Sequence, residues 1–189
     1  MNLQPPLTSR VASLPDGNRT EALAMPGTLD HTLVHKSDPA NVFVASIMRA
    51  DATPDGYDCF IANLHIDPSH PFFFEHPLDH VPGLMLIEAN RQVGTAISHR
   101  FYEVSHNLAF VLNSLDVVFE HFAELSAPLL ARFVIVAKTY RHDHLSALTC
   151  ESQWLQFDRP VGTMNARWSF SPPALLARLR RNAAAGEVH

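Results

Sequence analysis

A single carboxylate interrupts the most apolar stretch of this sequence. Glu88 follows the run LMLI, and Arg91 and Gln92 come three and four residues later. Residues at this spacing lie on one face of a helix, so the three polar side chains are expected to be neighbours. A carboxyl group among apolar neighbours can act as a general acid or base, since burial raises its pKa unless a cation such as Arg91 opposes the shift. The alternative role is an ion pair of Glu88 with Arg91 that fixes helix packing.

Three histidines stand in the segment before this stretch. His70 opens the run HPFFF, and His76 and His80 follow it. An imidazole can serve as a base or orient a thioester, and His70 is the first candidate of the three. The alternative is that His70 is a loop residue at the entrance to the helix.

The same segment also offers several side chains that can bind metals, namely His70, Glu75, His76, Asp79 and His80. Their spacing matches no zinc motif. Pro77 also prevents His76 and His80 from sharing one regular helix. We therefore expect that the protein holds no metal ion.

The neighbouring side chains suit an acyl substrate. Phe72, Phe73 and Phe74 follow His70 directly, and an apolar wall beside a polar group is what a tunnel for an acyl chain needs. Arg91 suits a phosphate or the phosphopantetheine arm of a carrier, because a guanidinium group binds phosphate well. The sequence shows no nucleophile elbow and no Gly-rich phosphate loop, which argues against serine-hydrolase and nucleotide-binding classes.

A helix is needed to bring these polar groups together. Pro82 and Gly83 mark its start, and no further proline occurs before Tyr102, so the pattern predicts a helix over residues 83–102. Apolar side chains cover almost every side of its first turns. We therefore expect a buried core helix rather than a surface helix.

Strands and turns are predicted on both sides of this helix. Residues 28–36 form a short extended piece, residues 107–122 contain two β-like pieces, and residues 174–185 form a short helix. Alternating or β-rich patterns predict strands over 41–49, 59–66, 129–141, 145–157 and 161–170. Strands joined by tight turns can form an antiparallel meander, which gives an α+β layout. An antiparallel sheet wrapped around a long central helix is the hotdog fold.

Composition limits the remaining possibilities. Hydrophobic residues make up 47% and charged residues 17% of the chain, as in globular proteins, and a net charge of −5 argues against nucleic-acid binding. The two cysteines form no disulfide framework, and we find neither a signal peptide nor a membrane span, so we expect a cytoplasmic protein. We divide the chain into a flexible segment (1–27), one hotdog domain (28–171) and a short C-terminal helix and tail (172–189).

Several blocks of the sequence resemble known hotdog enzymes. PGLMLIEANRQ, residues 82–92, is similar to the P-G-x-x-x-x-E-A segment of the β-hydroxyacyl-carrier-protein dehydratases, in which the glutamate is catalytic. A closer resemblance is to the A-factor biosynthesis (AfsA) hotdog family, with Glu88, Arg91 and Gln92 at the family's polar positions. The blocks that carry it are LVHK (33–36), NVFVAS (41–46), HPFFF (70–74) and LMLIEANRQVGTAISH (84–99).

This resemblance implies an enzyme that acts on acyl thioesters. Founding members join a β-ketoacyl chain to a dihydroxyacetone-phosphate-like acceptor on the way to γ-butyrolactone signals. The resemblance makes Glu88, His70 and Arg91 the catalytic candidates. The substrate-binding candidates are Gln92, Phe72, Phe73, Phe74, Gly83, His76 and His80. The carrier of the acyl chain is expected to be acyl-carrier protein or coenzyme A, with no other cofactor. Alternatives are a hotdog dehydratase or thioesterase, or a non-catalytic acyl-binding regulator.

Assembly is a further expectation. Founding members carry two hotdog repeats, whereas residues 34–170 of this chain provide one. A single antiparallel sheet covers only one face of an apolar helix, so another copy must cover the rest. We therefore expect a homodimer whose sheets join edge to edge, with Glu88 of one chain facing His70 of the other.

Overall fold

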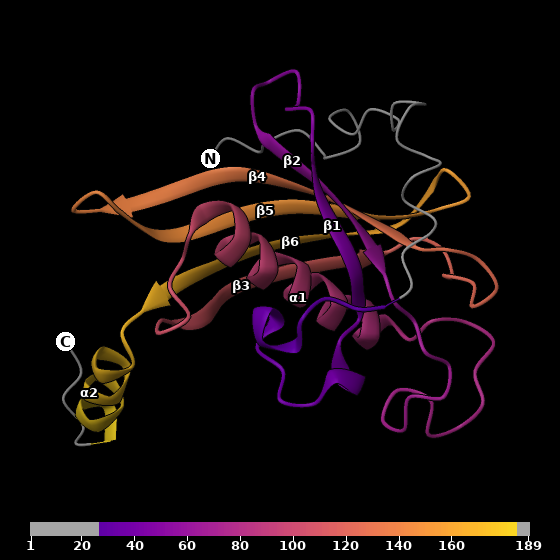
Figure 1. The fold of residues 1–189 in the computed structure, drawn as a ribbon, viewed down its shortest axis with the longest axis horizontal. Coiled ribbons are helices and arrows are strands. Elements are labelled where there is room, and N and C mark those ends of the chain that lie inside the picture. The colour runs from indigo at the N-terminus through magenta and orange to yellow at the C-terminus, as the bar shows by residue number, and fades with distance from the viewer. Residues whose placement is uncertain (1–26, 185–189) are drawn as a thin grey trace.

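The apolar stretch after Pro82 forms one long helix in the computed structural model, which describes residues 27–184. Helix α1 spans Gly83–Tyr102, as the sequence predicts (Figure 1). Pro82 precedes it in an extended conformation, and Glu103 ends it in the left-handed region, with φ of 55°. Among the described residues, no helix is long and apolar enough to cross a membrane.

Six antiparallel strands form one sheet that packs against α1. Their order across the sheet is β1-β2-β4-β5-β6-β3, which makes β1 and β3 the edge strands. The strands are β1 (Val44–Ala50), β2 (Asp58–Leu64), β3 (Ala109–Phe119), β4 (Leu130–Arg141), β5 (His144–Gln156) and β6 (Arg159–Ser171). Figure 1 shows α1 on one face of the sheet, with the β1 edge curling across the helix. The predicted α+β hotdog arrangement is therefore confirmed.

Two-residue turns hold the meander from β4 to β6 together. His142 and Asp143 join β4 to β5 with φ values of 47° and 64°, and Phe157 and Asp158 join β5 to β6 with φ values of 52° and 58°. Two consecutive positive φ values match the right-handed twist of the flanking strands. These tight turns fix the register of the three strands that form the floor beneath α1.

Alternation along β5 decides which face of the sheet α1 covers. Leu148, Cys150, Ser152 and Trp154 are buried, whereas Glu151 lies on the opposite face and is only half-buried. Successive side chains of a strand point to opposite faces, so the first set lies toward the helix.

The helix approaches the sheet closely at Gly94. A Cβ atom at this position would lie 3.4 Å from the Trp168 ring and 3.5 Å from the Phe133 ring. The Trp168 indole N–H donates to the Ser98 hydroxyl at 3.1 Å, which satisfies a polar group that burial would otherwise penalise. Packing and hydrogen bonding therefore fix the same side of α1 against β6.

Three local predictions differ from the structure. Residues 28–36 are not extended, because Asp30 accepts the Thr32 N–H at 2.8 Å and caps the 3-10 helix η3 (His31–Val34). A second short helix, η4 (Pro39–Asn41), follows. Residues 107–122 contain one strand, β3, whose pairing with β6 is irregular between Leu112 and Ser114. Helix α1 is also not covered all round, since Leu84 is 68% exposed.

The last described helix lies apart from this core (Figure 1). The predicted C-terminal helix is present as α2 (Pro173–Ala184), which projects from the end of β6 (Figure 1). The predicted flexible segment lies outside the described residues except for Gly27.

Candidate active site

A cavity of about 390 Å³ separates one side of α1 from the β3 side of the sheet. Polar groups enter it from the helix, whereas the strands supply only apolar side chains. It is lined by Leu84, Ile87, Glu88, Asn90, Arg91, Gly94 and Thr95 of α1, by Phe110, Leu112 and Leu115 of β3, by Phe133 of β4, by Met164, Ala166 and Trp168 of β6, and by His35. The arrangement suits a ligand with an apolar chain and a polar head.

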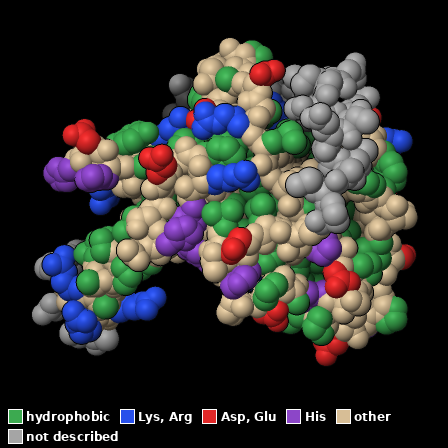
Figure 2. Space-filling model, viewed as in Figure 1, with side chains coloured by type: hydrophobic (Ala, Val, Ile, Leu, Met, Phe, Trp, Pro, Cys, Tyr) green, Lys and Arg blue, Asp and Glu red, His purple; other side chains and the backbone are tan. Residues whose placement is uncertain are grey.

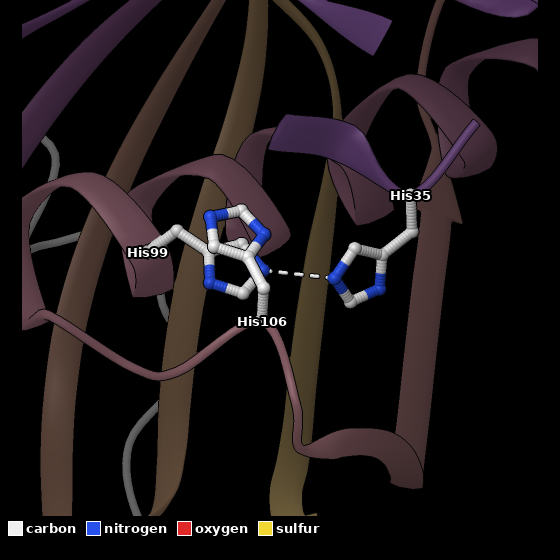
Figure 3. A group of neighbouring side chains, drawn as sticks. All are labelled: His35, His99 and His106. Carbon is white, nitrogen blue, oxygen red and sulfur yellow. Dashed lines mark hydrogen bonds between the residues drawn. The ribbon is translucent and has the colours of Figure 1, made fainter. Parts of the chain in front are cut away.

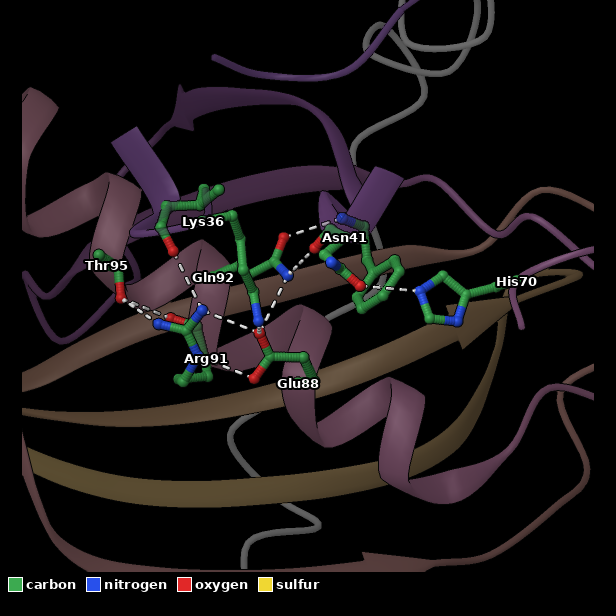
Figure 4. A network of polar contacts seen from close by, with 9 residues as sticks. Lys36, Asn41, His70, Glu88, Arg91, Gln92 and Thr95 are labelled. Carbon is green, nitrogen blue, oxygen red and sulfur yellow. Dashed lines mark hydrogen bonds and ion pairs between the residues drawn. The ribbon is translucent and has the colours of Figure 1, made fainter. Parts of the chain in front are cut away.

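Glu88 is the centre of the polar wall. Its two carboxylate oxygens accept paired hydrogen bonds from the Arg91 guanidinium, from Nε and Nη2, each at 2.8 Å. The ammonium group of Lys36 lies 2.7 Å from Oε1, and the side-chain amide of Gln92 donates to the same oxygen at 3.0 Å. Figure 4 shows these donors converging on the carboxylate from α1 and from the segment after η3.

These donors decide the protonation state of Glu88. Burial by itself raises the pKa of this carboxyl group, but hydrogen bonds from Arg91, Lys36 and Gln92 outweigh burial and lower the pKa from 4.5 to about 2. The sequence leaves open whether burial raises the pKa of Glu88 or a cation such as Arg91 opposes that rise. In the structure the cations oppose it. Glu88 is therefore a carboxylate at neutral pH.

Arg91 is itself held firmly in place. Besides Glu88, it donates to the Val34 carbonyl at 3.0 Å and to the Thr95 hydroxyl at 3.2 Å. Two cations, Lys36 and Arg91, face the single carboxylate of Glu88, so the cluster carries one positive charge in excess. An excess positive charge beside a cavity favours an anionic ligand group.

A chain of amide contacts connects Glu88 to His70 within one molecule. Gln92 donates to the Asn41 carbonyl at 2.7 Å and accepts the Phe43 N–H at 2.8 Å. The Asn41 side-chain oxygen lies 2.9 Å from Nε2 of His70 (Figure 4). Glu88 and His70 are thus linked without a second chain.

The hydrogen bonds of His70 define its tautomer. An amide oxygen accepts, so Nε2 of His70 carries the proton and donates to Asn41. The other ring nitrogen, Nδ1, lies 3.3 Å from the backbone N–H groups of Phe72 and Phe73 and accepts from them. His70 is buried, and both of its nitrogens are engaged by the protein.

The family model for the A-factor biosynthesis hotdog domain matches residues 18–172, which is most of the chain. The chain belongs to the A-factor biosynthesis hotdog family. The matched range includes every residue of the polar network that surrounds Glu88.

Two relatives in this family are each named 2-oxo-3-(phosphooxy)propyl 3-oxoalkanoate synthase. The relative from Streptomyces virginiae is 37% identical over 65 residues, which are 34% of this chain and 20% of the relative. The one from Streptomyces coelicolor is 49% identical over 35 residues, which are 18% of this chain and 11% of the relative. The matched segments thus span a fifth or less of each enzyme.

Solved structures support the fold. The crystal structure of a proposed thioesterase, YhdA from Lactococcus lactis, aligns with a TM-score of 0.52 at 11% identity. The alignment covers 69% of this chain and 94% of that protein. At this identity the likeness shows a shared hotdog fold.

The structure brings together only part of the predicted site. Glu88 and Arg91 line the cavity, and Gln92 lies buried behind them. The other predicted residues do not line it. Phe72 is 73% exposed, Phe73 packs on Phe43 and His70, and Phe74 packs against the core.

The remaining predicted residues also lie outside the cavity wall. His76 is exposed, and His80 contacts the Asp79 carboxylate and the Phe122 ring. Gly83 faces the Phe119 ring, because a Cβ atom there would lie 2.8 Å from that ring. These residues shape the entrance to α1 rather than the cavity.

His35, Lys36, Asn90 and Thr95 are polar residues of the site that the sequence does not predict, and two of them bear on its chemistry. Lys36 lies 52 positions before Glu88, and only the folding of η3 and η4 brings its ammonium group to the carboxylate. The block LVHK, which resembles the family, contains Lys36 and was the available signal.

Asn90 is the second of these residues, and it is fully buried. Its Nδ2 donates to the Ser152 hydroxyl at 2.6 Å, and that hydroxyl donates to the Met164 carbonyl at 2.9 Å. These two hydrogen bonds fix the orientation of the Asn90 side-chain amide. The Oδ1 atom of Asn90 is buried and has no hydrogen-bond partner among the described residues.

Proposed function

We propose that this protein transfers a β-ketoacyl chain from a thioester to a small hydroxylated acceptor that carries a phosphate, such as dihydroxyacetone phosphate. The family and the names of the two relatives support this class of reaction. The observation that carries the proposal is the cavity itself. One of its walls is apolar, and the other presents the Glu88–Arg91 pair with its excess positive charge.

Each wall suits one part of the reaction. The apolar side chains of β3 and β6, including Leu112, Leu115 and Met164, would take the acyl chain. Arg91 and Lys36 would bind the phosphate of the acceptor, since guanidinium and ammonium groups both bind phosphate oxygens. The side chains of Lys36 and Arg91 remain 26% and 39% exposed, so an acceptor can reach them.

The reaction exchanges a sulfur for an oxygen at one carbonyl carbon. The acceptor hydroxyl oxygen forms a bond to the thioester carbon, the carbon–sulfur bond breaks, and the hydroxyl proton ends on the departing thiol. Acyl-carrier protein or coenzyme A supplies the thioester, and no other cofactor takes part. Because these carriers work in the cytoplasm, the proposal places the protein there.

Glu88 is proposed to receive the hydroxyl proton and return it to the departing sulfur. With a pKa of about 2 it is a weak base in the empty site. An acceptor phosphate competes with Glu88 for Arg91 and Lys36, and the loss of those partners raises the pKa of Glu88. Binding of the acceptor thus makes Glu88 a better base when a base is needed.

His70 is given a positioning role in this scheme. Its hydrogen bond to Asn41 holds the segment whose carbonyl accepts from Gln92, and Gln92 in turn holds Glu88. The sequence-based expectation that His70 assists at the thioester stays a prediction. Both ring nitrogens of His70 are engaged by other groups, so a direct role at the thioester requires a rearrangement of the loop that contains His70.

The test follows the fate of the acyl group. The full chain is incubated with β-ketoacyl-carrier protein or β-ketoacyl-coenzyme A, with and without dihydroxyacetone phosphate, and the products are measured by mass spectrometry. We expect the phosphorylated ester only when the acceptor is present. Release of free acid at the same rate with and without acceptor would instead identify a thioesterase and overturn the proposal.

The second candidate is a non-catalytic acyl-binding regulator. The observation that favours it is that Glu88 is fully paired by three donors, as a structural carboxylate is. A ligand that binds the chain and is released unchanged, with no ester formed, would establish this candidate and exclude transfer.

A further inference from the structure

Three histidines from distant parts of the chain meet near the C-terminal end of α1, outside the Glu88 network. They are His99 in the last turn of α1, His35 directly after η3, and His106 in the connection from α1 to β3 (Figure 3). One ring nitrogen from each lies within 4.8 Å of the others. Figure 2 shows histidine side chains at the surface on the face of the molecule that carries α1.

His99 is held as metal-binding histidines usually are. Its Nδ1 donates to the Val104 carbonyl at 2.6 Å, which leaves Nε2 without a proton and with a lone pair that can accept a hydrogen bond or bind a metal ion. Metal-bound histidines usually donate their second ring N–H to a carbonyl or carboxylate in this way, which fixes the tautomer and the direction of the ring. The ring of His99 is buried, so this direction is maintained by packing.

His35 directs a nitrogen at the same point. Its Nε2 lies 2.8 Å from Nε2 of His99. With the His99 nitrogen unprotonated, this short contact requires either a proton on His35 or a cation shared by the two lone pairs. Burial and the neighbouring imidazoles lower the pKa of both residues, and a neutral imidazole is the form that binds metals.

His106 supplies the third imidazole. Its ring stacks on that of His99, with centroids 3.9 Å apart and planes 8° apart. The nitrogens of a tetrahedral zinc site are about 3.4 Å apart, as zinc–nitrogen distances of about 2.0–2.1 Å dictate. His106 must therefore turn out of the stack to coordinate, and it is exposed, so solvent leaves room for that turn.

We propose that His35, His99 and His106 bind a divalent transition-metal ion of the zinc type, with a fourth position left for water. Three imidazoles and no carboxylate suit zinc, nickel, cobalt or copper rather than magnesium or calcium. The sequence-based expectation of no metal ion rests on the possible ligands in residues 70–80 alone. These three histidines are spread over 72 positions and form no motif, so only the fold brings them together.

The position of the site suggests what the ion does. It joins the segment after η3, the end of α1 and the connection to β3, and so stabilises the three segments that surround one end of the cavity. His35 also lines the cavity itself. A bound cation there adds positive charge to the end of the cavity that contains Arg91 and Thr95.

The test uses the metal alone. The full chain without a histidine tag is freed of metals with a chelator, and zinc is titrated into it by isothermal calorimetry. We expect one ion per chain with a dissociation constant in the micromolar range or tighter, and a rise in melting temperature, because a ligand that binds only the folded state stabilises it. Cobalt should give the strong visible absorption of a tetrahedral site.

Two variants and one matched control locate the ion. His35→Asn and His106→Asn change exposed residues, and asparagine tolerates the left-handed backbone of His35, where φ is 57°. His142→Asn is the control, because His142 is also exposed with a φ of 47° but lies at the β4–β5 turn. We expect each site variant to weaken zinc binding at least tenfold and the control to bind as the parent does.

Three results would overturn the proposal. The first is the absence of zinc binding tighter than millimolar in the parent. The second is unchanged binding in the doubly substituted His35→Asn, His106→Asn chain. The third is an equal loss in the control, which would identify the turn as the binding place. Circular dichroism of each variant shows whether a loss of binding reflects a loss of fold.

Discussion

The carboxylate of Glu88 is surrounded by three donor side chains. A buried charge is stable only when it is paired and hydrogen-bonded, and Arg91, Lys36 and Gln92 provide that pairing. The same donors leave one positive charge in excess at the edge of an apolar cavity. In the proposed reaction an anionic acceptor would pair with this excess charge, and Glu88 would change from a partner of Arg91 to a base.

Replacing Glu88 with Gln keeps the size of the side chain and removes the carboxylate. We expect turnover in the acyl-transfer assay to fall at least 100-fold, about 2.7 kcal/mol in the barrier, with the circular dichroism spectrum unchanged. Glu151→Gln is the matched control, since Glu151 lies on the face of the sheet away from α1, and it should keep full activity. Activity of the Glu88 variant within threefold of the parent would leave Glu88 with a structural role only.

The lowered pKa of Glu88 also predicts how stability depends on pH. A carboxyl group whose pKa is lower in the folded than in the unfolded chain adds stability above the unfolded value, and that contribution is lost as the pH falls. For Glu88 the loss extends from about pH 4.5 down to about pH 2. Urea denaturation of the parent and of Glu88→Gln should show a difference in unfolding free energy at pH 6 that shrinks steadily below pH 4.5. A difference independent of pH would contradict the pairing.

At the scale of elements, the sequence predicts what depends on local patterns. Pro82, Gly83 and the apolar residues after them predict α1 from Gly83 to about Tyr102, and the β-rich patterns predict β5 and β6 to within a few residues. The sequence does not predict η3, because its residues also fit an extended conformation. The hydrogen bond by which Asp30 caps η3 stabilises the helical turn instead. For the same reason Lys36 was missed, since its contact with Glu88 depends on the path of η3 and η4.

The candidate site was predicted in its polar half only. Glu88 and Arg91 are three residues apart on one helix, so spacing alone places them together. The apolar wall comes from β3 and β6, and which strands face α1 depends on the order of strands across the sheet. Nearness in sequence favours the phenylalanine run beside His70 as that wall, but none of these three side chains lines the cavity.

Gly162 offers a test of how β3 is held against β6. A Cβ atom there would lie 2.4 Å from the Val118 carbonyl, a backbone atom of the paired strand that cannot turn away. We expect Gly162→Ala to lower the unfolding free energy by about 1–3 kcal/mol, as overpacking does. Gly83→Ala is the comparison, because its nearest neighbour is the Phe119 ring, which is half-exposed and can move. Equal losses in urea denaturation would contradict this account.

At the scale of the whole molecule, large apolar side chains beside the cavity are exposed on α1 and on β3. Leu84 on α1 is 68% exposed, and on β3 Leu112 is 57% and Phe119 is 50% exposed. Strand β3 is an edge of the sheet, and among residues 27–184 no other strand pairs with its outer side. Exposed apolar surface beside an unpaired edge marks a place where another chain is expected to bind.

We propose a two-fold symmetric homodimer in which this edge and the helices meet their copies. A second chain there would cover Leu84 and Leu112 and close the open side of the cavity, while each Glu88 keeps its own link to His70.

Light scattering should give about 42 kDa, twice the 21.0 kDa of one chain. Leu112→Lys should shift the protein to the monomer, because burying an unpaired ammonium group costs several kcal/mol. Tyr140→Lys is the matched control, because Tyr140 is also 57% exposed but lies at the far end of β4, and its variant should remain dimeric. A parent chain that is monomeric at micromolar concentration would end this proposal and leave the cavity open to solvent.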